Sequence, residues 1–268
     1  MIIELVCVGD ELLSGITLNT NAHWLSCEIA SLGASVSRVT TIGDSIQLIG
    51  RVLSESLARK PDMIIVTGGL GATYDDLTLE GLAAALGVKT QLDRSAVKML
   101  KRSYSRRGLH YTLDPVRLKM ATIPAGSTPV QNPVGSAPAV SVKSGRTQIY
   151  CLQGVPGEME AIFTKCISPV IKKHVGPFVV REENYEVEGV SEAMLSPALT
   201  RIVSSVPRRE LYLKTHPHGY AGTTPRLRIQ IVCRGTDARA IAKRLGDISS
   251  MLLAQVAELG GRVIVLNQ

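Results

Sequence analysis

The residues best suited to chemistry lie in one glycine-rich segment, TGGLGATYDD at residues 67–76. Three glycines in four residues let the backbone approach a ligand closely and turn its N–H groups toward an anion. Two carboxylates, Asp75 and Asp76, follow, and carboxylates beside a phosphate call for a divalent cation between them. The segment therefore favours a site for phosphate and metal. The same pattern also fits a tight turn before a helix whose dipole attracts acidic residues.

Two further acidic turns follow short apolar runs earlier in the chain. Asp10 and Glu11 come after the run at 2–8, and Asp44 comes after the run at 35–42. If these runs are neighbouring parallel strands, their carboxyl ends meet at one edge of the sheet, where ligands bind in open α/β folds. The three turns then converge on one site. Alternatively, each aspartate only caps the helix that follows it.

Strand, turn and helix alternate three times in the first half of the chain, which predicts an α/β sheet with helices on both faces. The third run, MIIVT, is apolar up to its final threonine, as expected for a strand buried on both faces. The predicted strands are 2–8, 35–42 and 63–67, and the predicted helices are 21–32, 46–60 and 78–86.

The pattern changes after Gly176-Pro177, which we interpret as a linker. A strand at 148–152 and a helix reaching about residue 174 precede it, so the domains are predicted at 1–175 and 178–268. The second is a small α+β unit. Its predicted strands are 179–187, 210–215 and 227–233, its helices are 191–203 and 237–259, and a turn-rich stretch covers 217–225.

The composition bounds the class of protein. The chain has 268 residues, 45% hydrophobic and 20% charged, with a net charge of +7 spread over both halves. This is a globular composition whose basic surplus favours anionic partners without naming them. Five cysteines without a Cys-x-x-Cys pair, no signal peptide and no membrane-length apolar run indicate a cytoplasmic protein.

Four motifs, in this order and spacing, resemble the molybdenum-cofactor-biosynthesis fold, and most closely the N-terminal domain of the CinA (competence-damage-inducible) family. They are GDELLSG from residue 9, followed by Asn19-Thr20-Asn21, then TGGLGATYDD, NPVGSAP from residue 132 and GVPGEM from residue 154. Residues 178–268, with GVSEAMLSPAL and LYLKTHPHG, look like the KH-like middle domain of that family. The sequence ends before the family's C-terminal deamidase domain, so we do not expect deamidation.

The resemblance implies a three-layer α/β/α domain that takes a small-molecule nucleotide, with Mg, Co or Mn as cofactor. It implies a nucleotide pyrophosphatase that hydrolyses ADP-ribose to AMP and ribose 5-phosphate, in a homodimer or other symmetric homo-oligomer. Asp44 and Asp76 would be catalytic, and Asp75 and Asp76 would bind the metal. The implied substrate-binding residues are Gly9, Asp10, Glu11, Asn21, Gly68, Gly69, Gly71, Thr73, Asn132, Gly135, Ser136 and Ala137.

Two other functions stay open: molybdopterin binding or adenylyl transfer, and a non-catalytic nucleotide-binding module. Three residues depart from the family pattern. Ala72 replaces a usual proline, Ala139 replaces a usual glycine, and Gln153 stands where proline is common.

Two features bear on anionic partners. The basic segment at 94–107 either offers Arg106 or Arg107 to a diphosphate or forms a solvated helix face. Nucleic acid is not expected, because the Gly-x-x-Gly loop of the second domain, at 219–222, lies between predicted strands rather than helices.

Overall fold

A computed structural model describes residues 1–106, 114–207, 210–222 and 224–265. The chain divides into two compact units, Met1–Val175 and Gly176–Gln268. Each unit has a hydrophobic core of its own.

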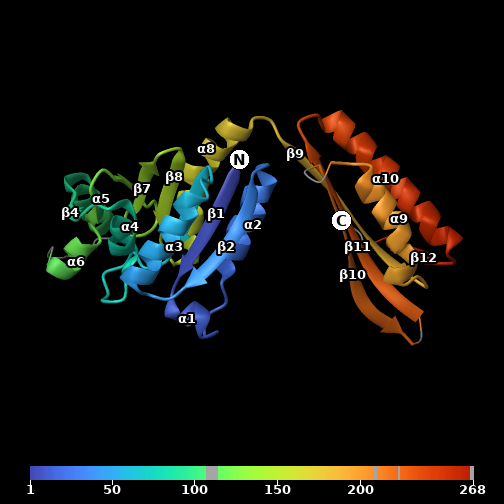
Figure 1. The fold of residues 1–268 in the computed structure, drawn as a ribbon, viewed down its shortest axis with the longest axis horizontal. Helices are drawn as coiled ribbons and strands as arrows, with labels where there is room; N and C mark the ends of the chain where they lie inside the picture. Colours follow the sequence, from blue (N-terminus) through green and yellow to red (C-terminus); the bar gives the residue numbers. More distant parts are fainter. Residues whose placement is uncertain (107–113, 208–209, 223, 266–268) are drawn as a thin grey trace. The chain divides into compact units, whose positions relative to one another are not determined.

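The first unit is built on a six-stranded sheet with the order β2-β1-β3-β8-β7-β6 (Figure 1). The four strands β2, β1, β3 and β8 run parallel, and β7 and β6 are antiparallel to their neighbours. Four parallel carboxyl ends therefore meet at one edge. The strands are β1 (Ile2–Val8), β2 (Ser35–Ile42), β3 (Met63–Thr67), β6 (Thr128–Val130), β7 (Ala139–Ser144) and β8 (Thr147–Leu152).

Helices cover both faces of this sheet, as expected from the sequence. Alternate side chains of β1 and β3 serve opposite faces: Ile3 and Ile65 belong to one core, and Val6 and Ile64 to the other. All five residues of β3 are buried, which explains its apolar run. One face carries α2 (Thr20–Ser31), α7 (Pro156–Ile162), the π-helix η1 (Phe163–Ile167) and α8 (Ser168–Val175), and the other carries α3 (Ile46–Ala58) and α4 (Thr78–Leu86). The fold is thus a three-layer α/β/α sandwich.

The remaining elements of this unit are α1, which follows β1, and four elements that lie between α4 and β6 in the sequence. Helix α5 is amphipathic, with Ala96, Leu100 and Ser103 buried and its basic side chains exposed. These elements are α1 (Asp10–Leu13), β4 (Thr90–Leu92), α5 (Arg94–Arg106), α6 (Pro115–Lys119) and β5 (Thr122–Pro124), of which β4 and β5 pair as a small antiparallel ladder.

The second unit is an antiparallel sheet of order β10-β11-β9-β12 whose core is shared with two helices. Strand β11 alternates strictly, with Leu227, Ile229, Ile231 and Cys233 facing that core. The elements are β9 (Val179–Glu188), α9 (Glu192–Ser204), β10 (Leu211–Ala221), β11 (Thr224–Gly235), α10 (Ala238–Glu258) and β12 (Arg262–Val265).

Some predicted elements differ from the structure. The stretch at 217–225, predicted as turns, is mostly a long β10–β11 hairpin whose ladder has an irregularity between Pro217 and Tyr220. The glycines at 219 and 222 belong to this hairpin rather than to a loop between helices. The predicted helix ending near residue 174 is interrupted by η1, and β6, β7 and β12 were not predicted.

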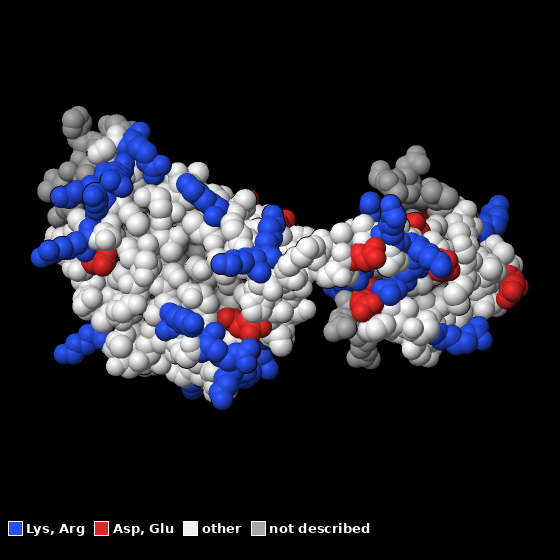
Figure 2. All heavy atoms as spheres, turned by 90° about the horizontal axis from the view of Figure 1, so that it is seen from above, with Lys and Arg blue, Asp and Glu red and all other residues white. Residues whose placement is uncertain are grey.

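Basic side chains are spread over both units on the face drawn in Figure 2, and acidic side chains lie among them on the second unit. The surplus of Lys and Arg therefore does not mark one site. Among the described residues, no helix is long and apolar enough to cross a membrane.

Candidate functional site

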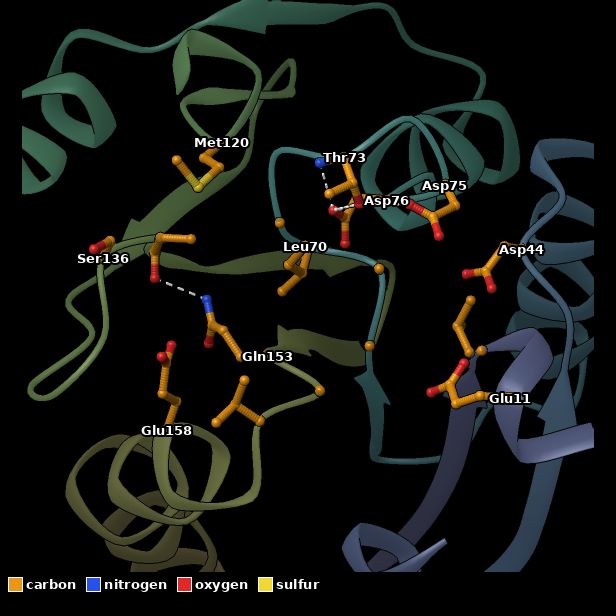
Figure 3. A pocket seen from close by; sticks show the side chains of 18 residues that line it. Glu11, Asp44, Leu70, Thr73, Asp75, Asp76, Met120, Ser136, Gln153 and Glu158 are labelled. Carbon is orange, nitrogen blue, oxygen red and sulfur yellow. Dashed lines mark hydrogen bonds between the residues drawn. The ribbon is translucent and has the colours of Figure 1, made fainter. Parts of the chain in front are cut away.

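A pocket of about 410 Å³ lies at the carboxyl ends of the four parallel strands of the first unit (Figure 3). We call it the strand-end pocket. Its location is where ligands bind in open α/β sheets. It is lined by Val8, Gly9, Glu11, Asp44, Gly68, Gly69, Leu70, Gly71, Thr73, Asp75, Asp76, Met120, Ser136, Ala137, Gln153, Gly154, Val155 and Glu158.

One side of the pocket, which we call the acidic wall, carries Glu11, Asp44, Asp75 and Asp76 (Figure 3). The turns after β1 and β2 hold each other: the N–H of Asp10 donates to Asp44 Oδ2 at 2.8 Å, and the N–H of Asp44 donates to Asp10 Oδ1 at 3.2 Å. Burial raises the pKa of Asp44. The hydrogen bond from the Asp10 N–H lowers it, and the carboxylates of Asp10, Glu11 and Asp75 raise it. This wall therefore has a surplus of negative charge.

Thr73 shapes the glycine-rich turn of the acidic wall. Its N–H donates to Asp76 Oδ2 at 2.8 Å, and its hydroxyl contacts the carboxylates of both Asp75 and Asp76. The hydroxyl bond from Thr73 lowers the pKa of Asp75. The turn is also tied to α4, because the Thr78 hydroxyl donates to the carbonyl of Gly68 at 2.8 Å.

The opposite side, which we call the amide wall, is formed by the loop at 132–137, by Gln153 at the end of β8 and by Glu158 on α7. Gln153 Nε2 donates to the carbonyl of Ala137 at 2.8 Å. Asn132 Nδ2 donates to the same carbonyl at 3.0 Å and to Glu158 Oε2 at 2.6 Å. The side-chain oxygen Oδ1 of Asn132 accepts from the backbone N–H groups of Val134 and Gly135. One buried amide thus fixes both the loop and Glu158.

Most of the residues predicted to bind substrate line the strand-end pocket, but four do not. Asp10 turns its carboxylate to the backbone of Asp44. Asn132 and Gly135 are buried behind the wall, because the Asn132 side chain is consumed by loop contacts. Asn21 lines a neighbouring cavity of about 90 Å³ and donates to the carbonyl of Gly154 at 2.8 Å.

Helix α5 does not present its basic residues to the strand-end pocket. The Arg106 guanidinium donates to the backbone carbonyls of Asn132 and Pro133, behind the amide wall. Lys98, Lys101, Arg102 and Arg106 line a separate groove. Arg107 lies outside the described residues.

Sequence reasoning assigned no role to Leu70, Met120, Gln153 or Glu158, all of which line the pocket. Glu158 lies inside the GVPGEM motif, and Gln153 was visible as a departure from the family pattern. Lys119 was also missed: its Nζ donates to the carbonyl of Thr73 and brings a positive charge to the glycine-rich turn.

The donor chemistry of the acidic wall suits a hard cation, because every side-chain ligand on it is a carboxylate or a hydroxyl oxygen. Within the part of the chain that the structure describes, no three His, Cys, Asp or Glu side chains are grouped closely enough to hold a metal ion by themselves. A cation here would need oxygens from a ligand as well, which is the usual arrangement for Mg²⁺.

The fold and pocket define a class: a three-layer α/β/α domain with a polar pocket at the carboxyl ends of its parallel strands. Residues 4–173 match the family described as "Probable molybdopterin binding domain". The chain belongs to this family of probable molybdopterin-binding domains.

Related proteins cover nearly the whole chain. A protein of Aeropyrum pernix is 40% identical over 97% of this chain and 95% of its own length. A protein of Metallosphaera sedula is 36% identical over 96% and 95%. A solved structure described as the protein CinA with unknown function, from Thermoplasma acidophilum, is 36% identical with a TM-score of 0.58, covering 64% of this chain and 99% of its own.

These findings correct the predicted enzyme class. The prediction of a nucleotide pyrophosphatase acting on ADP-ribose is wrong, because the matching family is one of molybdopterin-binding domains and the solved relative carries no such activity in its description. The prediction came from the resemblance to the CinA family and assigned the catalytic roles to strand-end carboxylates. In the structure, Asp75 and Asp76 are engaged by Thr73 and shape the turn.

Proposed function

We propose that the strand-end pocket binds a molybdopterin-type ligand, a pterin ring system that carries a terminal phosphate. The family match over residues 4–173 carries this proposal. A pocket of about 410 Å³ is within the usual size range for small-molecule sites.

The glycine-rich turn is suited to the phosphate. Among the described residues, the N–H groups of Gly69, Leu70 and Gly71 have no hydrogen-bond acceptor, so they can donate to an anion. A Cβ at Gly71 would come within 2.5 Å of Asp76 Oδ2, so alanine at this position would displace that carboxylate from the turn. Lys119 adds a positive charge beside Thr73.

A divalent cation completes the phosphate end of this proposal. A phosphate beside Asp44, Glu11 and Asp75 would be repelled, and Mg²⁺ held by these carboxylates and the phosphate would neutralise the repulsion. Bound there, the ion supplies positive charge to phosphate oxygens.

The far end of the pocket is suited to a flat ring. Leu70, Met120 and Ala137 line the pocket with apolar atoms, and polar groups of the amide wall lie beside them (Figure 3). This mixture of apolar contacts and a few polar groups is typical of small-molecule sites.

The acidic wall favours a second candidate, adenylyl transfer to the same ligand. A phosphate oxygen of the ligand would attack the α-phosphorus of ATP, and pyrophosphate would leave. The reaction gathers negative charge near Asp44 and therefore requires the cation. The KH-like nature of residues 178–268 and a symmetric homo-oligomer stay predictions.

The test is equilibrium binding of molybdopterin to the full chain under anaerobic conditions, with Mg²⁺, followed by the fluorescence of its oxidised form. Saturable binding is expected in the wild type and in Gly246→Ala, and weaker binding in Gly71→Ala. Gly246 is a fair control because it has open space on α10. Addition of ATP distinguishes the candidates: pyrophosphate release with an adenylated ligand identifies transfer. Absence of binding to the wild type would refute both.

A further inference from the structure

The amide wall contains a buried acceptor that lacks a donor. Gln153 is 5% exposed, its Oε1 is fully buried, and among the described residues this oxygen has no hydrogen-bond partner. A buried unsatisfied carbonyl is rare in native structures and is costly in free energy. Because Gln153 lines the strand-end pocket, a ligand is one source of the missing donor.

The orientation of the Gln153 amide follows from chemistry. Its nitrogen lies 2.8 Å from the carbonyl of Ala137. A flipped amide would place two acceptor oxygens against each other at that distance. The amide oxygen is therefore the group left without a partner.

Glu158 supplies a second acceptor on the same wall. Asn132 Nδ2 donates to its Oε2 at 2.6 Å, and among the described residues Oε1 has no hydrogen-bond partner. In Figure 3, the carboxylate of Glu158 and the oxygen end of Gln153 lie on the same side of the pocket, away from Asp44 and Glu11. Both side chains are anchored through the carbonyl of Ala137, directly for Gln153 and through Asn132 for Glu158.

Two fixed acceptors select for donors. We infer that Gln153 and Glu158 accept hydrogen bonds from the edge of a heterocyclic ring that carries a ring N–H next to an exocyclic amine. The 2-amino-4-oxo edge of a pterin or a guanine has this arrangement. Such an edge offers two or more parallel N–H donors. Adenine offers a ring nitrogen acceptor beside its amine, which would face an acceptor of the wall. The inference rests on the proposed function, and it assigns the ring of the ligand to the amide wall.

The test compares pterin with 4-oxopteridine, the same ring without the 2-amino group, as competitors of molybdopterin on the full chain. In the wild type, pterin should compete about tenfold better or more, because the analogue leaves an acceptor unpaired. Gln153→Met and Glu158→Gln should each bring the ratio toward one. Competition by inorganic pyrophosphate, which reports the glycine-rich turn, should change little in either variant.

Gln148→Met is the matched control. Gln148 lies on β8, the strand that Gln153 follows. Its Nε2 donates to Ser141 Oγ at 2.8 Å and to the carbonyls of Val142 and Ile149 at 3.2 Å and 3.5 Å, and it does not line the pocket. Its variant should keep the wild-type ratio. A second readout needs no ligand: Gln153→Met removes a buried unsatisfied acceptor along with one hydrogen bond, and the carbonyl of Ala137 keeps its bond from Asn132, so the Tm should stay close to that of the wild type.

The outcomes separate the two claims. If the wild type binds molybdopterin but does not distinguish pterin from 4-oxopteridine, or if Gln153→Met keeps the wild-type ratio, this inference is overturned while the proposed function stands. In that case a water molecule satisfies Gln153. If the wild type does not bind molybdopterin but still prefers pterin over its analogue in direct titration, the proposed function fails and the edge recognition survives.

Discussion

The acidic wall and the amide wall face the same pocket but are built in different ways. In the acidic wall, the glycine-rich turn is held by contacts that are short in sequence, from Thr73 to Asp75 and Asp76. The turns after β1 and β2 are joined by backbone-to-carboxylate bonds between Asp10 and Asp44, 34 residues apart, which follow directly from the pairing of the two strands. The amide wall is held by contacts that are long in sequence: Asn132 reaches Glu158, 26 residues away, and Gln153 reaches Ala137, 16 residues away.

The walls also differ in what they lack. The acidic wall has a surplus of negative charge: burial raises the pKa of Asp44, and the neighbouring carboxylates raise it further. The amide wall, among the described residues, leaves two side-chain acceptors without a donor: the buried Oε1 of Gln153 and the Oε1 of Glu158. One wall therefore needs positive charge and the other needs a hydrogen-bond donor. A ligand with a phosphate at one end and an amino-substituted ring at the other would satisfy both.

The strongest way to break the acidic wall is Gly68→Ala. Gly68 has φ +98°, a conformation that favours glycine, and an added Cβ would overlap the backbone carbonyl of Val8. We expect a loss of about 3 kcal/mol in unfolding free energy and loss of ligand binding, because the turn must move. Urea denaturation and the molybdopterin titration measure the two effects.

Gly126→Ala is a control that distinguishes the steric clash with Val8 from the preference of a positive φ for glycine. Gly126 has φ +82° but nothing within 4 Å of an added Cβ. It should lose about 1 kcal/mol and keep ligand binding. Equal losses in both variants would show that the approach of Gly68 to Val8 is unimportant.

This difference between the walls explains which parts of the site could be predicted from the sequence. The acidic wall was predictable, because each acidic turn directly follows an apolar run and the parallel sheet brings such turns together. The amide wall was not, because nothing local shows that Asn132 bonds to Glu158. Asn132 was therefore assigned to the substrate, although it is fully buried. The same limit applies to β7, whose pairing with β8 is a tertiary feature.

The amide wall should be disrupted by changing Asn132, which supports the wall but does not line the pocket. Asn132→Ala removes an amide that serves two backbone N–H groups, one carbonyl and Glu158. We expect a loss of about 2 kcal/mol in unfolding free energy, because the buried N–H of Gly135 loses its acceptor. The preference for pterin over 4-oxopteridine should fall as well, since Glu158 loses its anchor.

The neighbouring Gln131→Ala is the control for this change. Gln131 is only partly buried and donates one hydrogen bond, to the carbonyl of Asn132. Its loss should be clearly smaller, and its ring preference should match the wild type. A ring preference unchanged in Asn132→Ala would mean that Glu158 is positioned by other contacts.

The smallest effect, and the one of opposite sign, is expected at Asp44 in the acidic wall. Asp44→Asn keeps an oxygen for the Asp10 N–H and removes a charge that is buried beside other carboxylates. Because the folded state raises the pKa of Asp44, the native protein binds this proton more tightly than the unfolded chain does. The wild type therefore loses stability as the pH rises above 3.8 through the raised pKa.

At neutral pH, Asp44→Asn should accordingly melt at a higher temperature than the wild type, and the difference should shrink as the pH falls toward 3.8. Mg²⁺ should raise the Tm of the wild type more than that of the variant, because the cation relieves a repulsion that the variant no longer has. Glu55→Gln, on the exposed side of α3, changes the charge equally without touching the pocket and should show neither effect. Calorimetry over pH, with and without Mg²⁺, measures all three proteins. A lower Tm for Asp44→Asn at neutral pH would show that the charge of Asp44 is already balanced within the protein, and the acidic wall would then not require a cation.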